Sequence, residues 1–156
     1  MISSLYETTY NILRDDATLE SYCTSVFGSK AWIAVGYDEE RSLNKDYNPL
    51  IQIIKISSVE NEPKARENTF SIEVGVTLHQ SETLIEPSIT LATKKIEYKG
   101  VLAVEDFREQ VENAIIRGEK TYKGTVRATG DTINNSTFPI YKSVSLLQLK
   151  QIKSMR

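Results

Sequence analysis

The stretch FSIEVGVTL, residues 70–78, alternates large apolar side chains with polar or small ones at every step. Successive side chains of a β-strand point to opposite faces of the sheet, so this spacing predicts a strand with one buried and one solvated face. The side chains expected on the buried face are Phe70, Ile72, Val74, Val76 and Leu78. On the opposite face we expect Glu73 and Thr77 to be exposed to solvent.

A second stretch, NPLIQIIKIS at residues 48–57, is apolar at almost every position after its proline. Simple alternation would place Leu50, Ile54 and Ile56 on one face and Ile51 and Ile53 on the other. Apolar residues on both faces predict a strand that is covered, at least in part, on both sides. Two polar, charged loops flank this strand, at residues 38–48 and 57–69.

Apolar residues recur at helical spacing in residues 2–14, in the segment between Asp16 and Gly28, and in residues 103–117. Asp16 is a suitable N-cap for the second helix, and Gly28 stands where a C′ glycine is favoured. Cys23 falls on the apolar stripe of that helix. We predict that Cys23 is a buried, unreactive thiol, because apolar surroundings suppress the thiolate.

Further strands are predicted at residues 31–37, 120–128 and 139–152, with a strand or extended segment at residues 88–100. The order is two helices, four strands, one helix and two strands. Clustered strands favour an α+β fold with a mainly antiparallel sheet and helices packed on one face. We interpret residues 1–156 as a single domain, because the length suits one domain and no repeat or linker interrupts it.

Composition narrows the classes of function. The net charge of −2 does not suggest a protein that holds nucleic acid through its overall field. One cysteine rules out an internal disulfide framework, and one histidine rules out a two-histidine zinc site. We therefore expect no metal or organic cofactor. No apolar run is long enough to span a bilayer and the N-terminus does not resemble a signal peptide, so we expect no membrane partner.

The common catalytic motifs are missing: there is no glycine-rich phosphate loop and no GxSxG elbow. His79 continues the solvent-facing parity of the strand at 70–78, and we interpret it as an exposed polar residue. We predict no catalytic residue and no enzymatic activity.

Charged clusters have plain structural interpretations. Acidic pairs occur at Asp15–Asp16, Glu39–Glu40 and Glu105–Asp106. The first and third lie at predicted helix starts and the second in a loop, so capping and solubility explain them. Lys94, Lys95 and Lys99, with Tyr98, could contact phosphate, but an edge strand protected by lysines explains them equally well.

Six segments in order carry a wider resemblance: LYETTYNILRDD, VFGSK, NPLIQIIKIS, FSIEVGVTL, VEDFREQVENAII and PIYKSVSLLQL. Together they resemble the small tail terminator, or tail-completion, proteins of tailed phages and of phage-derived injection machines. The resemblance covers nearly the whole chain. It is less clear over residues 79–102 and 122–128.

The resemblance implies a structural virion protein that forms a ring, commonly a hexamer. Such a ring caps the tail tube and gives the head a docking surface. The implied partners are further copies of the chain, the tail tube protein and head–tail connector proteins, without sequence-specific nucleic acid. The implied location is the virion tail, after assembly in the host cytoplasm. In such a ring we expect the two charged loops of neighbours to meet, with interface residues Glu39, Arg41, Lys45, Lys64 and Arg66.

Three other interpretations remain open. The chain could be another head–tail connector or tube-associated protein, which would share the scaffold and differ in its partner. It could be a small hydrolase or transferase, which would need a pocket where His79 meets acidic residues. It could also be a ligand-binding module.

Overall fold

The computed structural model describes residues 2–59, 67–80 and 87–152. The elements follow the chain in this order: α1 (Ile2–Asp15), α2 (Ala17–Phe27), β1 (Trp32–Val35), α3 (Glu39–Ser42), the 3₁₀ helix η1 (Lys45–Tyr47), β2 (Leu50–Ser58), β3 (Glu67–His79), β4 (Ser88–Thr90), β5 (Lys95–Glu97), α4 (Gly100–Arg117), the 3₁₀ helix η2 (Glu119–Tyr122), β6 (Gly124–Asn134) and β7 (Ile140–Ile152).

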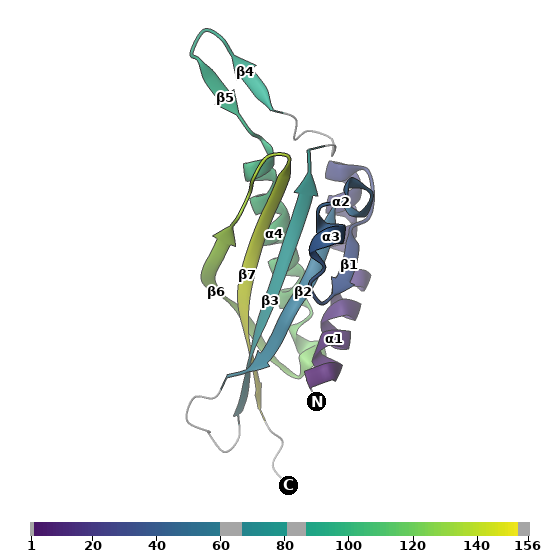
Figure 1. Cartoon of the computed structure of the whole chain (residues 1–156). Helices are drawn as coiled ribbons and strands as arrows, with labels where there is room; N and C mark the ends of the chain where they lie inside the picture. The colour runs from purple at the N-terminus through teal and green to yellow at the C-terminus, as the bar shows by residue number, and fades with distance from the viewer. Residues whose placement is uncertain (1, 60–66, 81–86, 153–156) are drawn as a thin grey trace.

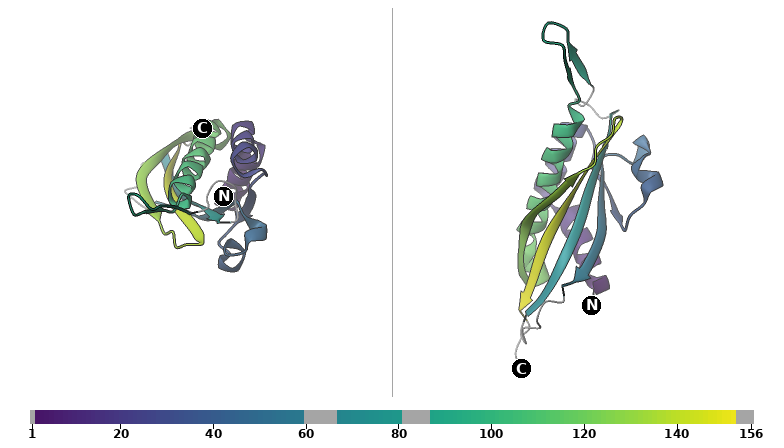
Figure 2. Two further views of the ribbon diagram at one scale, coloured as in Figure 1. Left: turned by 90° about the horizontal axis from the view of Figure 1, so that it is seen from above. Right: turned by 60° about the vertical axis from the view of Figure 1, so that its left-hand side comes forward.

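Among the described residues, five strands form the main sheet in the order β1-β2-β3-β7-β6 (Figure 1). The β2–β3, β3–β7 and β6–β7 pairs are antiparallel, and β1 joins the edge parallel to β2. The helices α1, α2 and α4 lie on one face of this sheet (Figures 1 and 2). The predicted α+β class is therefore confirmed, with a mainly antiparallel sheet.

The apolar core lies between that face of the sheet and the three helices. Its fully buried members come from β2, β3, β7 and α4 and include Ile51, Ile53, Ile72, Leu78, Val104, Phe107, Ile115, Leu147 and Leu149. An aromatic cluster joins α2 to α4, where the rings of Phe27 and Phe107 have centroids 5.2 Å apart. Burial of this apolar surface is the main stabilising term for a chain of this size.

The ends of α2 follow the prediction. The Leu19 amide donates to Asp16 Oδ1 at 2.8 Å, so Asp16 is the N-cap, and Gly28 ends the helix at a φ of +79°. Cys23 is buried between them, and burial raises the pKa of its thiol to about 12. The prediction of a buried thiol is confirmed.

The alternation of β3 is confirmed on the core face, where all five predicted side chains are buried. Glu73 is partly exposed on the other face, but Thr77 is only 2% exposed, so the prediction for Thr77 was wrong. Thr77 pairs with Leu50 of β2. Two residues further along β2, Gln52 Nε2 donates to the Asp38 carbonyl at 3.1 Å. The α3–η1 segment therefore folds over this end of the outer face and takes it out of solvent.

The predicted faces of β2 were wrong beyond its middle. A register shift between Ile53 and Lys55 marks a β-bulge, after which Ile56 pairs with Ile72 and joins the core with Ile53. A bulge adds one unpaired residue, which reverses the parity of the positions that follow. Ile54 is left on the outer face, against Gly75.

The extended segment predicted at residues 88–100 is a separate two-stranded hairpin, β4–β5, and not a strand of the main sheet. The lysines there consequently do not protect an edge of the main sheet, whose edges are β1 and β6. The strand predicted at 120–128 begins later, because η2 occupies residues 119–122. The strand predicted at 139–152 matches β7 closely.

Candidate assembly site

The β4–β5 hairpin projects from one end of the molecule, away from the main sheet (Figures 1 and 2). We call residues 88–99 the arm. Ile89 pairs with Ile96 across the hairpin, and Leu91 follows in its turn. These three side chains are largely exposed, and Leu91 reaches 85%. Clustered exposed apolar side chains on a projection are typical of a contact surface, since scattered single ones need no explanation.

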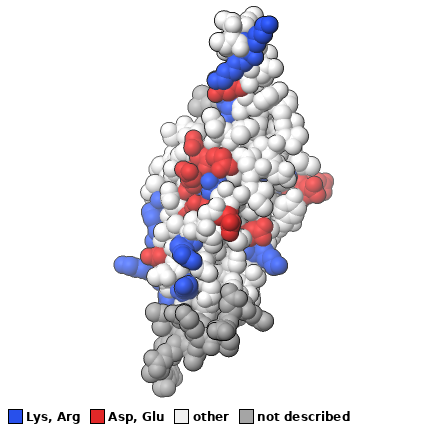
Figure 3. Space-filling view, turned by 90° about the vertical axis from the view of Figure 1, so that its left-hand side faces the viewer, with Lys and Arg blue, Asp and Glu red and all other residues white. Residues whose placement is uncertain are grey.

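The turn of the arm is closed by the backbone. The Lys94 amide donates to the Leu91 carbonyl at 3.2 Å, and Lys94 adopts a positive φ of 52°. Lys94, Lys95 and Lys99 make the arm basic, with Glu97 as its one acidic residue. Figure 3 shows blue atoms at the top of the molecule, where the arm projects. The arm thus combines apolar side chains with positive charge.

The base of the arm is held by the body of the protein. The ring of Tyr98 contacts that of Phe138, in the β6–β7 connection, with centroids 5.6 Å apart. Two residues further, Gly100 is buried against the ring of Tyr141, and the Val101 amide donates to the Tyr98 carbonyl. The arm therefore leaves the body beside the β6 edge in a direction fixed by packing.

A second exposed apolar surface lies at the β1 edge of the main sheet. We call residues 32–47 the β1–α3 patch. Its exposed apolar side chains, each between 50% and 55% accessible, are Trp32, Tyr37 and Leu43. Val35 is also exposed, but it leaves the opposite face of β1 from Trp32. The Trp32 ring contacts Tyr47 with centroids 5.1 Å apart, and the Arg41 guanidinium lies over Tyr47 at 5.4 Å. Apolar and aromatic side chains with an Arg are the composition enriched in protein interfaces.

Short-range hydrogen bonds shape the charged part of this patch. The Arg41 amide donates to Asp38 Oδ1 at 3.1 Å, and Arg41 Nη1 donates to Asp38 Oδ2 at 2.7 Å. These bonds from the Arg41 backbone and side chain lower the pKa of Asp38. Asp38, the N-cap of α3, and Arg41 therefore pair with each other.

The structure places three of the predicted interface residues on this patch. Glu39 and Arg41 lie on α3 and Lys45 on η1, all exposed. Lys64 and Arg66 lie outside the described residues. Their predicted contact with Glu39, Arg41 and Lys45 of a neighbour stays a prediction.

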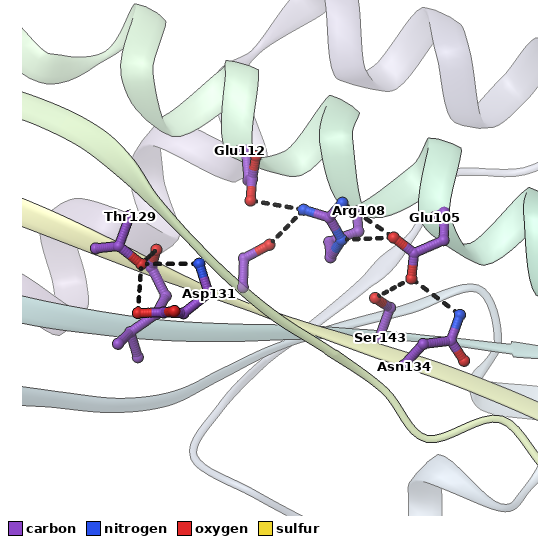
Figure 4. A network of polar contacts seen from close by, with 9 residues as sticks. Glu105, Arg108, Glu112, Thr129, Asp131, Asn134 and Ser143 are labelled. Carbon is purple, nitrogen blue, oxygen red and sulfur yellow. Dashed lines mark hydrogen bonds and ion pairs between the residues drawn. The ribbon is translucent and has the colours of Figure 1, made fainter.

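A polar layer lies where α4 faces β6 and β7, beside the apolar core (Figure 4). Arg108, only 7% exposed, donates to Glu105 at 3.0 Å, to Glu112 at 2.6 Å and to Ser145 Oγ at 3.0 Å. Glu105 also accepts from Ser143 at 2.6 Å and from Asn134 at 2.9 Å. The layer therefore ties α4 to both β6 and β7 through bonds that need a defined geometry.

The prediction that the Glu105–Asp106 pair lies at the start of a helix was wrong. The helix α4 begins at Gly100, and Glu105 lies in its second turn. Burial raises the pKa of Glu105, but hydrogen bonds from Ser143, Arg108 and Asn134 outweigh it and hold the pKa below its usual value. A carboxylate held ionised by these donors is poorly suited to act as a general acid, which needs a raised pKa.

His79 lies on the other face of the sheet from this layer, by the alternation of β3. Burial and the nearby Lys45 lower its pKa. The prediction of an exposed side chain was wrong, because His79 is partly buried. Glu105 and His79 therefore do not form the acid–imidazole pair that a hydrolase would use.

One depression of about 260 Å³ lies between α1 and the end of α4, and its lining includes Asp16, Arg117 and Thr121. Its charged groups bind each other, since Arg117 Nη2 donates to Asp16 Oδ1 at 2.8 Å. Among the described residues, no cluster of His, Cys, Asp or Glu could hold a metal ion. In the same part of the chain, no helix is both long and apolar enough to cross a membrane.

No family model matches the sequence, and no curated protein matches it. The functional interpretation therefore depends on the surfaces described above and on the order of elements. Of these surfaces, sequence reasoning located the charges of the β1–α3 patch but missed its apolar side chains and the arm. The sequence signal that could have indicated this surface is the presence of three aromatic residues, Trp32, Tyr37 and Tyr47, in and near the charged loop at residues 38–48.

Proposed function

We propose that this chain is a structural, ring-forming subunit of the tail terminator type, without enzymatic activity. The observation that carries the proposal is the presence of two separate exposed apolar surfaces, the arm at one end of the molecule and the β1–α3 patch at one edge of the main sheet. A head-to-tail interface needs two different surfaces on each subunit, and such an interface closes into a ring when its rotation is suitable.

The interior of the chain supports a scaffolding role. The polar layer around Arg108 holds α4 on β7. The arm leads directly into the first turn of α4. A subunit that must match the symmetry of a tube needs such fixed geometry. The net charge of −2 suits a ring through which DNA passes, because many exposed Lys and Arg would hold the phosphates.

In this proposal the partners are further copies of the chain, the tail tube protein and the head–tail connector proteins, and the ring is a hexamer in the virion tail. The order of elements and the resemblance described above support these partners. The alternative connector or tube-associated role would use the same two surfaces with another partner.

Sedimentation velocity over a range of protein and salt concentrations tests the proposal, together with binding to isolated tail tubes. We expect a larger assembly at high protein concentration or on the tubes, and weaker assembly in high salt where rim ion pairs are screened. A chain that stays monomeric at high concentration and does not bind tail tubes would contradict it.

A further inference from the structure

We propose that the arm of one copy docks on the β1–α3 patch of the next copy. This inference rests on the proposed function and specifies the interface that would build the ring. It starts from the exposure of the arm, where Ile89, Leu91 and Ile96 are exposed to solvent on a hairpin that no other described element covers. A two-stranded hairpin is only marginally stable by itself, so a partner that covers these side chains would stabilise it.

The surface that receives the arm must lie on another copy of the chain. The arm leaves the body next to Phe138, in the connection between β6 and β7, and β6 is one edge of the sheet. The β1–α3 patch lies at the other edge. The contacts of Tyr98 with Phe138 and of Gly100 with Tyr141 direct the arm away from the body (Figure 2), so it does not cover the patch of its own chain.

The two surfaces carry opposite charge. The arm holds three lysines and one glutamate, a net charge of +2 over residues 88–99. The patch holds four carboxylates and two basic residues, a net charge of −2 over residues 32–47. The pairs Lys95–Glu97 and Arg41–Asp38 are internal to each surface, and the remaining charges include Lys94 and Lys99 on the arm and Glu39 and Glu40 on the patch. Complementary charge steers encounter and selects orientation.

Apolar side chains with lysines on a projecting hairpin could also touch an anionic membrane. The patch favours a second copy, because it offers exposed apolar side chains and the opposite charge on the same chain. Each copy would then use its arm on one neighbour and its patch on the other. This is the heterologous arrangement that a closed ring requires.

Two single variants separate the surfaces. Leu91→Asp disables the arm and Leu43→Asp disables the patch, and both replace exposed side chains. The matched control is Ile133→Asp, which changes another exposed apolar side chain, on β6 and outside both surfaces. Thermal melting of each variant verifies that it is folded. Assembly is measured in solution and on isolated tail tubes, so that a chain which assembles only on a tube is also tested.

We expect each disabled variant to raise the dissociation constant for self-association about tenfold or more, as loss of a central apolar contact does. Ile133→Asp should assemble like the unchanged protein. An equimolar mixture of the two disabled variants should form dimers and stop there, because each dimer joins the one intact arm to the one intact patch. A symmetric exchange of arms within a pair would instead stop the unchanged protein at dimers, so an assembly of the unchanged protein larger than a dimer distinguishes the two arrangements.

If the unchanged protein assembles and Leu91→Asp or Leu43→Asp assembles equally well, the arm-to-patch contact is wrong while the ring remains. If Ile133→Asp disrupts assembly as strongly as the other two, the contact is not specific and the inference fails. If the unchanged protein neither self-associates nor binds tubes, the proposed function fails with it. Binding of the monomer to phosphatidylserine vesicles that is lost in Leu91→Asp would assign the arm to a membrane and overturn the inference.

Discussion

The ring of Tyr141 fills the space that a side chain on Gly100 would need. A Cβ built on Gly100 would lie 2.3 Å from Tyr141 Cε2, and Tyr141 is itself 1% exposed in the core. Gly100 begins α4 immediately after the arm, and Tyr141 is near the start of β7. The contact therefore joins the base of the arm to the main sheet.

We predict that Gly100→Ala lowers the free energy of unfolding by about 1–3 kcal/mol, because the buried ring must move and overpack its surroundings. The better helix propensity of alanine offsets at most about 1 kcal/mol of this. Leu102→Ala, at an exposed position in the same helical turn, should change the value by less than about 0.5 kcal/mol. Urea unfolding measures both, and equal effects would show that the contact with Tyr141 does not constrain the backbone.

Glu105 predicts a pH dependence of stability. Its pKa in the folded protein is lowered from the usual 4.5, since the hydrogen bonds from Ser143, Arg108 and Asn134 outweigh burial. A lowered pKa contributes stability that is present above the unfolded value and is lost as the pH falls through the folded value. We expect the stability of the unchanged protein to fall on acidification below about pH 4.5 more steeply than that of Glu105→Gln.

Urea unfolding at a series of pH values measures this difference. At neutral pH, Glu105→Gln should be the less stable protein, because Arg108 then loses an ionised partner. Glu40→Gln is the control for loss of one carboxylate, on the exposed surface of α3. Parallel curves for Glu105→Gln and the unchanged protein would refute the structural role of this carboxylate.

The two faces of β3 should respond differently to truncation. Val74→Ala should lower the free energy of unfolding by roughly 1–3 kcal/mol, from lost burial and a residual cavity. Glu73→Ala should change it by less than about 0.5 kcal/mol, because Glu73 lies on the partly exposed face. Denaturant unfolding of the two variants checks the assignment, which equal losses would contradict.

The Cys23 thiol should be inert in the folded protein. Its pKa of about 12 leaves on the order of one thiolate in ten thousand at pH 8, and the side chain is also buried. A thiol-specific chromophoric reagent should therefore react slowly with the native protein and rapidly in urea. A Leu91→Cys variant, with its new thiol exposed on the arm, should react at once at one site and serve as the positive control.

Local patterns predicted the main sheet well where tertiary contacts agree with them. The alternation of β3 and the caps of α2 depend on residues close in sequence, so they were predicted correctly. The bulge after Ile53 depends on pairing with β3, which no local pattern of β2 encodes. The burial of Thr77 likewise depends on the α3–η1 segment, about thirty residues earlier in the chain.

The candidate surfaces were harder to predict for a related reason. Ile89, Leu91 and Ile96 have the spacing of an extended segment, and that spacing is the same in a buried sheet and in a projecting hairpin. Trp32 and Val35 belong to a strand that the sequence predicts. Their exposure follows from the position of β1 at the edge of the sheet, which the local pattern does not indicate. Polar partners of Arg108 are up to 37 residues away in sequence, so the layer itself was not predicted.

The ion pair between Arg117 and Asp16 has a consequence at the other end of the molecule. Arg117 is the last residue of α4, and Asp16 caps α2, so the pair holds one end of an 18-residue helix whose other end carries the arm. Such a helix is about 27 Å long and acts as a rigid lever. A small tilt of α4 at Arg117 would become a larger displacement at the tip of the arm. The Arg117–Asp16 pair, remote from the arm, therefore helps to hold the direction in which the arm projects.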